Sequence, residues 1–188
     1  MRLIRYLASA GVASRRKCES IITGGRVTVN GKDETDPFRI ISTSDTVELD
    51  QTPVKTFIEK TVVMLHKPAS VVTTANDTHG RKTVLDLVSN IKPRLFPVGR
   101  LDKETTGILL LTNDGDLTYR LTHPKFGVEK IYEVTADRFF TDAEINSISS
   151  GVDIGEGEMG QATVIDQTDT ANGVKITMKL HHGKKREI

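Results

Sequence analysis

The 188-residue sequence has a single cysteine, no tryptophan and no long apolar run. One cysteine, Cys18, excludes an intramolecular disulfide framework and cannot by itself form a cysteine-rich zinc site. No apolar run approaches the roughly 20 residues that span a bilayer, and the start of the chain lacks the pattern of a secretory signal peptide. We therefore expect a cytoplasmic protein that is stabilised by packing.

The sequence also lacks the motifs of several common chemistries. It has no Walker phosphate loop, no GxGxxG that follows a strand and no GxSxG nucleophile elbow. The stretch "GEGEMG" (155–160) holds two Glu and no Lys, so it would repel phosphate, and a turn is the better interpretation. His181 and His182 are adjacent in an expected strand, which sends their rings to opposite faces. Because metal ligands must converge, we expect no metal site.

Charge is distributed unevenly along the chain, although the formal net charge is only +1. Residues 1–32 carry seven basic residues and one acidic residue, whereas residues 33–59 carry two basic and seven acidic ones. Residues 60–132 are again basic in excess, and residues 133–180 are acidic. This segregation is typical of a protein with a nucleic-acid-binding surface, and ordinary solvated faces are the alternative explanation.

Residues 2–32 fit two short helices followed by a strand. Apolar residues within 3–10 recur at helical spacing, and Gly11 ends this helix. Ser14 suits the N-cap of a second helix, and "RVTVNG" (26–31) alternates like a strand and closes on an Asn-Gly turn. Basic residues in the first turn of the second helix oppose its macrodipole, so a bound anion explains them better than helix stability does.

Residues 49–60 have the proline and mixed polarity of a connector between two domains. "GILLLT" (107–112) shows no alternation, so we expect a strand that is buried on both faces. We expect strands over 61–67, 69–74, 107–112, 130–136, 173–180 and within the glycine-broken stretch 151–165, and short helices over 83–88 and 116–123. The second domain is thus predicted to be a strand-rich α+β unit.

Asp102 is the best candidate for a reactive group. An isolated Asp in such a segment is usually a turn residue that bonds its own backbone. Here Arg100 and Lys103 flank it, Glu104 supplies a second carboxylate, and the strand that follows holds the loop, which is typical of a functional carboxylate. The residues alone leave both interpretations open.

Residues 1–48 resemble the S4 domain, a small RNA-binding module. The resemblance rests on the order of a helix, the motif "SRR", a second helix and the motif "GRVTVNGK". It implies contact with RNA through the two-helix face. The RNA-binding residues that we expect are Arg2, Arg5, Arg15, Arg16, Lys17, Arg26 and Lys32.

Residues 61–188 resemble the catalytic domain of ribosomal RNA pseudouridine synthases in which an S4 domain comes first. "PVGRLDKETTGILLLTNDGDL" (97–117) is similar to the family signature, and "HKPASVVTT", "EKIYEV" and "HGKKREI" are similar to three further motifs. The resemblance implies an α+β fold with a mixed or antiparallel sheet, and isomerisation of uridine without a cofactor. It also implies that the C-terminal part of the catalytic domain is missing beyond Ile188.

The resemblance assigns roles to individual residues. Asp102 stands at the position of the essential catalytic aspartate, Tyr132 at that of the active-site tyrosine, and Arg186 at that of the basic residue that pairs with the carboxylate. The substrate-binding residues that it implies are Arg100, Lys130 and Ile188. Without the resemblance, Tyr132 would be interpreted as an ordinary strand residue and Arg186 as a solvated charge.

Two positions depart from the family pattern: Ser70 stands where glycine is usual, and Glu187 where glutamine is common. The latter favours the branch that modifies the large-subunit (23S) RNA. We expect a monomer that binds a structured stem-loop of ribosomal RNA, either free or within a pre-ribosomal particle.

Several alternatives stay open. A small-subunit (16S) enzyme and a non-catalytic S4-type ribosome-assembly factor would carry much of the same sequence. A glycosidase would need a second carboxylate across a sugar, for which Glu104 is the nearby candidate. Asp102 itself fits either a nucleophile on the sugar or a base that removes the 2′ proton.

Overall fold

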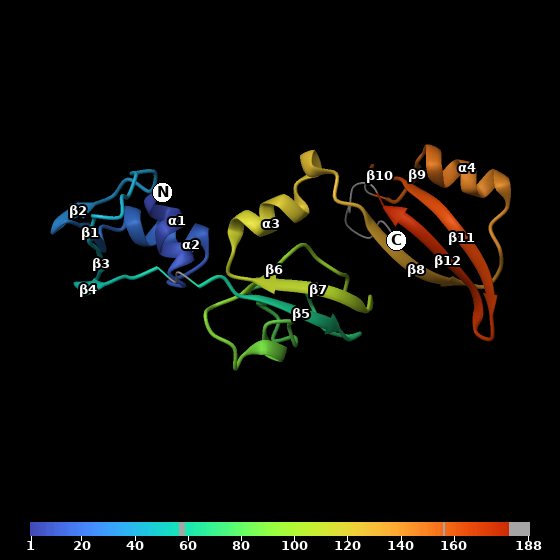
Figure 1. Ribbon diagram of the computed structural model, residues 1–188, viewed down its shortest axis with the longest axis horizontal. Helices are drawn as coiled ribbons and strands as arrows, with labels where there is room; N and C mark the ends of the chain where they lie inside the picture. The colour runs from blue at the N-terminus through green and yellow to red at the C-terminus, as the bar shows by residue number, and fades with distance from the viewer. Residues whose placement is uncertain (57–58, 156, 181–188) are drawn as a thin grey trace. The chain divides into compact units, whose positions relative to one another are not determined.

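The computed structural model describes residues 1–56, 59–155 and 157–180, and the chain divides into two compact units, Met1–Tyr119 and Arg120–Ile188 (Figure 1). The first unit holds two separate hydrophobic clusters, and the second unit holds one. Within the described ranges, every helix is too short or too polar to span a bilayer.

The N-terminal part of the first unit combines two helices with a four-stranded sheet of order β2-β1-β3-β4. Its elements are α1 (Leu3–Ser9), α2 (Arg15–Thr23), β1 (Val27–Val29), β2 (Lys32–Glu34), β3 (Val47–Leu49) and β4 (Thr52–Pro53). Apolar side chains from both helices and from the sheet form one core: Leu3, Leu7, Cys18, Ile21, Ile22, Val27, Val29, Ile41 and Val47.

The local signals of this part form as predicted. Ser14 caps α2, and its hydroxyl accepts a hydrogen bond from the N–H of Lys17 at 3.4 Å. Asn30 and Gly31 take φ values of 54° and 75°, which the two-residue turn between β1 and β2 requires. The order of helix, helix and strand predicted for residues 2–32 is therefore confirmed.

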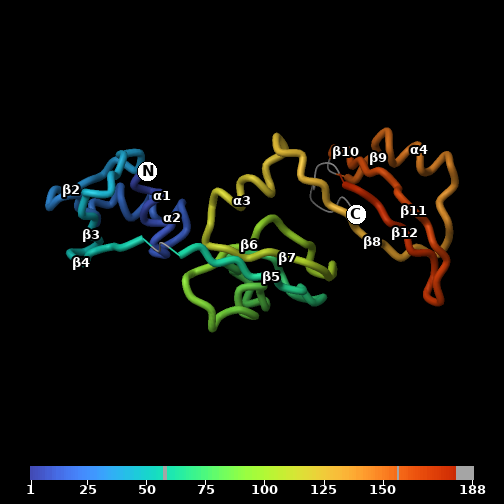
Figure 2. Tube along the Cα trace, in the orientation of Figure 1, coloured from blue at the N-terminus to red at the C-terminus, as the bar shows by residue number. Residues whose placement is uncertain are grey.

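The rest of the first unit is built on a three-stranded antiparallel sheet of order β5-β7-β6. Its strands are β5 (Val62–Lys67), β6 (Phe96–Pro97) and β7 (Gly107–Thr112). Residues 68–95 run along one side of this sheet and include the 3-10 turn η1 (Asp86–Val88) (Figure 2). In the second cluster, Leu109 and Leu111 of β7 pack against four apolar side chains of this segment: Val71, Val84, Val88 and Leu95.

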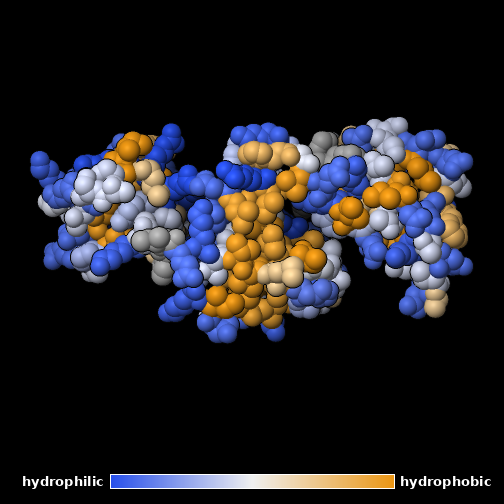
Figure 3. All heavy atoms as spheres, in the orientation of Figure 1, coloured by the Kyte–Doolittle hydropathy of each residue, from blue (hydrophilic) through white to orange (hydrophobic). Residues whose placement is uncertain are grey.

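Strand β7 is not buried on both faces, contrary to the prediction for residues 107–112. Leu109 and Leu111 are buried, whereas Ile108 is 69% exposed. Met64 on the neighbouring strand is 72% exposed, and Figure 3 shows apolar side chains gathered over this side of the sheet. An unbroken apolar run is buried throughout only where layers cover both faces. Among the described residues, segment 68–95 covers one face.

Two further predictions for this region hold only in part. The strand expected over 69–74 is reduced to a single parallel bridge between Val72 and Thr83, because Pro68 and the left-handed Ser70 (φ 63°) turn the chain away from β5. The short helix expected over 83–88 is present as the 3-10 helix η1 and begins later than predicted, because Thr83 is engaged in the bridge to Val72.

The helix predicted over 116–123 is confirmed as α3 (Gly115–Thr122). The 3-10 turn η2 (Pro124–Phe126) follows it. Pro124 disfavours the helical conformation of the residue before it, His123, whose backbone is extended, so α3 ends ahead of this point.

The second unit is a three-stranded antiparallel sheet of order β11-β12-β8, which confirms the strands predicted over 130–136 and 173–180. Its elements are β8 (Lys130–Ala136), α4 (Asp142–Ser150), β9 (Val152–Asp153), β10 (Met159–Gly160), β11 (Ala162–Thr170) and β12 (Gly173–Leu180). Helix α4, which the sequence analysis did not predict, contributes Ile148 to the core of this unit. The α+β architecture with antiparallel sheets is as predicted.

Candidate active site

Asp102 lies in the segment that connects β6 to β7. Its backbone carbonyl accepts a hydrogen bond from the N–H of Thr105 at 3.1 Å, which makes a tight turn. Gly99 and Gly107 on either side have positive φ values of 77° and 133°. The side chain of Asp102 is exposed, and its carboxylate forms no hydrogen bond or ion pair with any residue that the structure describes. The carboxylate is thus presented to solvent by a folded turn.

Lys67, the last residue of β5, is completely buried beside this turn. Its ammonium donates hydrogen bonds to the carbonyls of Pro68 (3.0 Å), Lys103 (2.9 Å) and Thr105 (2.8 Å). An ammonium has three donors, so all of them are satisfied by the backbone. Burial lowers the pKa of Lys67, and the negative charges of Glu104 and Asp102 oppose that shift.

Thr73 reaches the same turn from the other side of Asp102. Its hydroxyl donates to the carbonyl of Leu101 at 2.7 Å and accepts from the N–H of Leu101 at 3.4 Å. The Thr73 residue is only 7% exposed. The backbone on both sides of Asp102 is therefore bonded to buried polar side chains.

Unlike the carboxylate of Asp102, that of Glu104 has two partners among the described residues. Its carboxylate pairs with the ammonium of Lys103 at 3.3 Å and accepts from the hydroxyl of Ser70 at 3.2 Å. The Lys103 contact is the larger cause of its lowered pKa. Ser70 has the left-handed backbone conformation for which the family's usual glycine is suited, and it retains that conformation with a side chain present.

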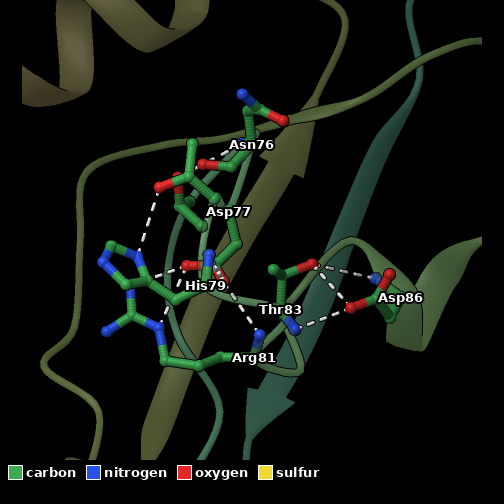
Figure 4. Close-up of polar contacts among 8 residues, drawn as sticks. Asn76, Asp77, His79, Arg81, Thr83 and Asp86 are labelled. Atoms are coloured by element: carbon green, nitrogen blue, oxygen red, sulfur yellow. Dashed lines mark hydrogen bonds and ion pairs between the residues drawn. The ribbon is translucent and has the colours of Figure 1, made fainter.

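A densely bonded loop links Thr73 to η1 (Figure 4). The carboxylate of Asp77 accepts from the backbone N–H groups of His79 (3.0 Å) and Arg81 (2.8 Å) and pairs with the Arg81 guanidinium at 2.6 Å. These contacts, Arg81 foremost, hold the pKa of Asp77 well below its usual range. Asp86 accepts from the N–H of Thr83 (2.7 Å) and from its hydroxyl (2.9 Å), which fixes the start of η1.

Tyr132 and Lys130 lie in the second unit, two residues apart on β8, and so share one face of the strand. Tyr132 pairs with Met178 across the sheet, is half-buried and packs against the core of that unit. Lys130 pairs with Leu180 and is also half-buried. The structure brings these two predicted residues together, whereas Asp102 and Arg100 belong to the first unit.

Five residues singled out in the sequence lie outside the described residues: His181, His182, Arg186, Glu187 and Ile188. The predicted substrate-binding residue Arg100 lies within the described part of the chain and is exposed. Within the described ranges, no three His, Cys, Asp or Glu side chains come together as metal ligands would.

The predicted RNA-binding residues differ in how they are held. Arg15, Arg16 and Lys17 are exposed in the first turn of α2, and Lys32 is exposed on β2. By contrast, the guanidinium of Arg26 forms two hydrogen bonds with Asp50, and that of Arg5 lies 2.6 Å from Asp116. The guanidinium of Arg2 lies 5.3 Å from the ring centroid of Phe38.

Comparison with known proteins identifies the family. Residues 61–188 match the model of the family described as RNA pseudouridylate synthase, and residues 1–47 match that of the S4 domain. The chain belongs to the RNA pseudouridine synthases. This RNA pseudouridine synthase is thus a member of an isomerase family, and its S4 domain implies binding to RNA.

Named relatives agree with this assignment. The chain is 36% identical over 191 residues to the ribosomal large subunit pseudouridine synthase B of Bacillus subtilis, with all of this chain and 77% of that protein covered. It is 34% identical to an uncharacterized RNA pseudouridine synthase of Aquifex aeolicus, of which it covers 76%. It is 36% identical to the ribosomal large subunit pseudouridine synthase B of Yersinia pestis, of which it covers 61%.

A solved structure supports the fold alone. A crystal structure of a pseudouridylate synthase matches all of this chain and 81% of that one, with a TM-score of 0.59 at 23% sequence identity.

Sequence reasoning about this synthase missed Lys67 and Thr73. Both lie in "HKPASVVTT", a stretch that the family resemblance includes but for which it suggested no role. The signal available in the sequence was a lysine and a threonine at otherwise apolar positions, and only the fold shows that both reach the Asp102 turn.

Proposed function

We propose that this RNA pseudouridine synthase converts a specific uridine of large-subunit (23S) ribosomal RNA to pseudouridine, with Asp102 as the catalytic carboxylate. The observation that carries the proposal is an exposed carboxylate on a turn whose flanking backbone is bonded to buried Lys67 and Thr73. The choice of RNA is supported by the names of the relatives from Bacillus subtilis and Yersinia pestis, both large-subunit enzymes.

The reaction breaks the C1′–N1 bond of uridine, turns the detached uracil and forms a C1′–C5 bond. The proton on C5 leaves and N1 gains one, so no electrons are exchanged and no redox cofactor is needed. Asp102 begins the reaction either as a nucleophile at C1′ or as a base at the 2′ position. Both routes need an ionised carboxylate that is aimed at the sugar, and an exposed carboxylate with no partner among the described residues suits either.

Other residues are assigned supporting roles in this proposal. The ring of Tyr132 stacks on the uracil, with its hydroxyl near C5, and Arg186 pairs with the carboxylate and keeps it ionised. Arg100, Lys130 and Ile188 contact the substrate. The target base must leave its stack to reach Asp102, so binding to RNA beyond the site is required. The exposed cations of α2 are suited to that contact.

The proposed substrate is tested by mapping pseudouridine in ribosomal RNA from cells that lack this protein. Loss of one site in large-subunit RNA, restored by the parent gene, is the expected result. Loss of a site in small-subunit RNA would contradict the proposed substrate and favour the 16S alternative. If no site is lost while the purified protein binds ribosomal RNA, the enzyme proposal fails and an assembly factor is favoured.

The proposed role of Asp102 predicts that Asp102→Asn lowers the single-turnover isomerisation rate by at least about a hundredfold, because the amide is neither a nucleophile nor a base. Since the substitution keeps the shape of the side chain, the affinity for RNA should stay near that of the parent. The rate is measured on an unmodified large-subunit RNA transcript. Asp169→Asn, at another exposed carboxylate, is the matched control and should leave the rate unchanged. Full activity of Asp102→Asn would overturn the assignment.

A further inference from the structure

We propose that the hydroxyl of Thr73, together with the ammonium of Lys67, fixes the backbone on both sides of Asp102, and that Thr73 is a positioning residue for the isomerisation. This inference rests on the proposed function, because it concerns the aim of Asp102 as the reacting carboxylate.

Thr73 occupies a position at which an apolar side chain would be expected. In the extended segment 71–74, Val71 and Thr73 are buried, while Val72 and Thr74 are partly exposed. This alternation places Thr73 on the side that faces the core. A hydroxyl in such a place costs free energy unless it is hydrogen-bonded, and the partner that it finds is Leu101.

The contact with Leu101 fixes a particular peptide group. The carbonyl that accepts from Thr73 belongs to the peptide bond between Leu101 and Asp102, so its direction sets the plane from which the Asp102 side chain departs. The same hydroxyl accepts from the N–H of Leu101. Among the described residues, these two backbone groups have no other hydrogen-bond partner.

Lys67 holds the following residues in the same way. Its ammonium bonds the carbonyls of Lys103 and Thr105, and the N–H of Thr105 closes the turn on the carbonyl of Asp102. The buried polar side chains among the described residues are Lys67, Thr73, Thr83 and Thr112. Two of these four contact the turn that contains Asp102, which marks this turn as the place where buried polar groups are concentrated.

The aim of Asp102 depends on these contacts. Its carboxylate has no partner among the described residues, so within that part of the chain its direction depends on the backbone of the turn. The turn lies outside the β-ladders, and its shape is therefore set by Thr73, Lys67 and the Thr105 bond. A shift of about 1 Å in a reacting group can reduce a rate by about a hundredfold.

Thr112 offers a matched control within the same unit. It is completely buried, and its hydroxyl also donates to a backbone carbonyl, that of Thr61 at 2.7 Å, and accepts from a backbone N–H, that of Asp114 at 2.9 Å. Thr73→Val and Thr112→Val therefore remove the same kind of hydroxyl from the same kind of site. Only the first contacts the Asp102 turn.

The experiment compares Thr73→Val, Thr73→Ser and Thr112→Val in the full chain. Three quantities are measured: the urea midpoint of unfolding, the affinity for an unmodified large-subunit RNA transcript and the single-turnover rate on it. Amide hydrogen exchange over residues 99–106, followed by mass spectrometry, reports the order of the turn directly.

Both valine variants should lower the urea midpoint by similar amounts and leave the affinity for RNA unchanged. Thr73→Val should reduce the rate by about 10- to 100-fold and speed exchange over residues 99–106. Thr112→Val should do neither, and Thr73→Ser, which keeps the hydroxyl, should recover most of the rate. If Thr73→Val does not fold, Thr73→Cys, with a weaker donor of similar size, should give an intermediate rate.

Equal rates and equal exchange in Thr73→Val and Thr112→Val would overturn the inference, as would a fully active Thr73→Cys. Asp102→Asn in the same assay separates this outcome from failure of the proposed function. If Asp102→Asn is inactive and Thr73→Val is normal, only the positioning role fails. If Asp102→Asn is fully active, the proposed function fails, and the positioning role fails with it.

Discussion

Lys67 brings a positive charge into the core of the first unit, where an unpaired ammonium would cost several kcal/mol. Three backbone carbonyls offset that cost by accepting all of its donors. Among the described residues no carboxylate bonds it directly, and the neighbouring charges of Glu104 and Asp102 act on it at longer range. The side chain thus joins the end of β5 to the Asp102 turn through its hydrogen bonds.

Lys67→Met should lower the free energy of unfolding by about 1–3 kcal/mol, because the variant loses all three hydrogen bonds that the buried ammonium makes to backbone carbonyls. Urea denaturation measures the change. Lys103→Met is the control, since Lys103 is 54% exposed and its ion pair with Glu104 is worth about 0–1 kcal/mol. Equal losses in the two variants would show that the three hydrogen bonds of Lys67 do not stabilise the fold.

The sequence predicts the reactive residue better than the residues that hold it. Asp102 stands in a continuous signature, so one stretch of chain is enough to identify it. Thr73 and Lys67 contact turn residues that lie 28 to 38 positions further along the chain, and no local spacing in the sequence indicates such contacts. Sequence and structure agree on Ser70. The sequence has a serine where glycine is usual in the family, and the structure shows the left-handed backbone that favours glycine there.

At the scale of helices and strands, predictions succeed where one local signal decides. Ser14 begins α2 and Asn30–Gly31 closes the first hairpin, because capping and positive φ are properties of a few adjacent residues. The burial of β7 was predicted wrongly because it depends on what covers each face of the sheet. Exposed Ile108 and buried Leu109 are equally apolar, and only the position of segment 68–95 distinguishes them.

Helix α4 carried a signal that the sequence analysis overlooked. Thr141 and Glu144 form a capping box in which each side chain accepts from the backbone N–H of the other. Glu144 also pairs with Arg138 at 2.7 Å. The Arg138 guanidinium first, and then the Thr141 N–H, lower the pKa of Glu144 to about 2.

This lowered pKa predicts how the stability of the fold responds to acid. A carboxylate with a lower pKa in the folded state stabilises the fold above its unfolded pKa of about 4.3, and that contribution is lost as the pH falls through about 2. Glu144→Gln should therefore melt at a lower temperature than the parent near neutral pH, and the difference should vanish near pH 2. Thermal melts across this range measure it.

Glu19→Gln is the matched control for Glu144, because the Glu19 carboxylate on α2 has no hydrogen bond or ion pair with any described residue. Its melting curve should follow that of the parent at each pH. A Glu144→Gln difference that stays constant down to pH 2 would contradict the assigned role of the carboxylate.

At the scale of the whole molecule, the sequence correctly predicts the α+β class, and it shows directly that basic residues are concentrated in the first 32 positions. The connector predicted at residues 49–60 stays a prediction, since the compact unit Met1–Tyr119 includes residues on both sides of it. Net charge would not have indicated a nucleic-acid partner, because acidic segments cancel the basic ones. The structure adds which cations are available: some are exposed and others are already paired within the protein.

Arg15, Arg16 and Lys17 should carry much of the electrostatic contribution to RNA binding, because they are exposed and placed against the helix dipole of α2. Replacing all three with alanine should reduce the slope of log K against log salt concentration by about 2 to 3, since each phosphate contact contributes about 0.7 to 0.9. Filter binding of a ribosomal RNA transcript between about 50 and 200 mM salt measures the slope. Arg26→Ala should change it less, because its guanidinium must first leave Asp50. An unchanged slope in the triple variant would show that α2 does not contact phosphates, and binding would then have to be assigned to other cations of the chain.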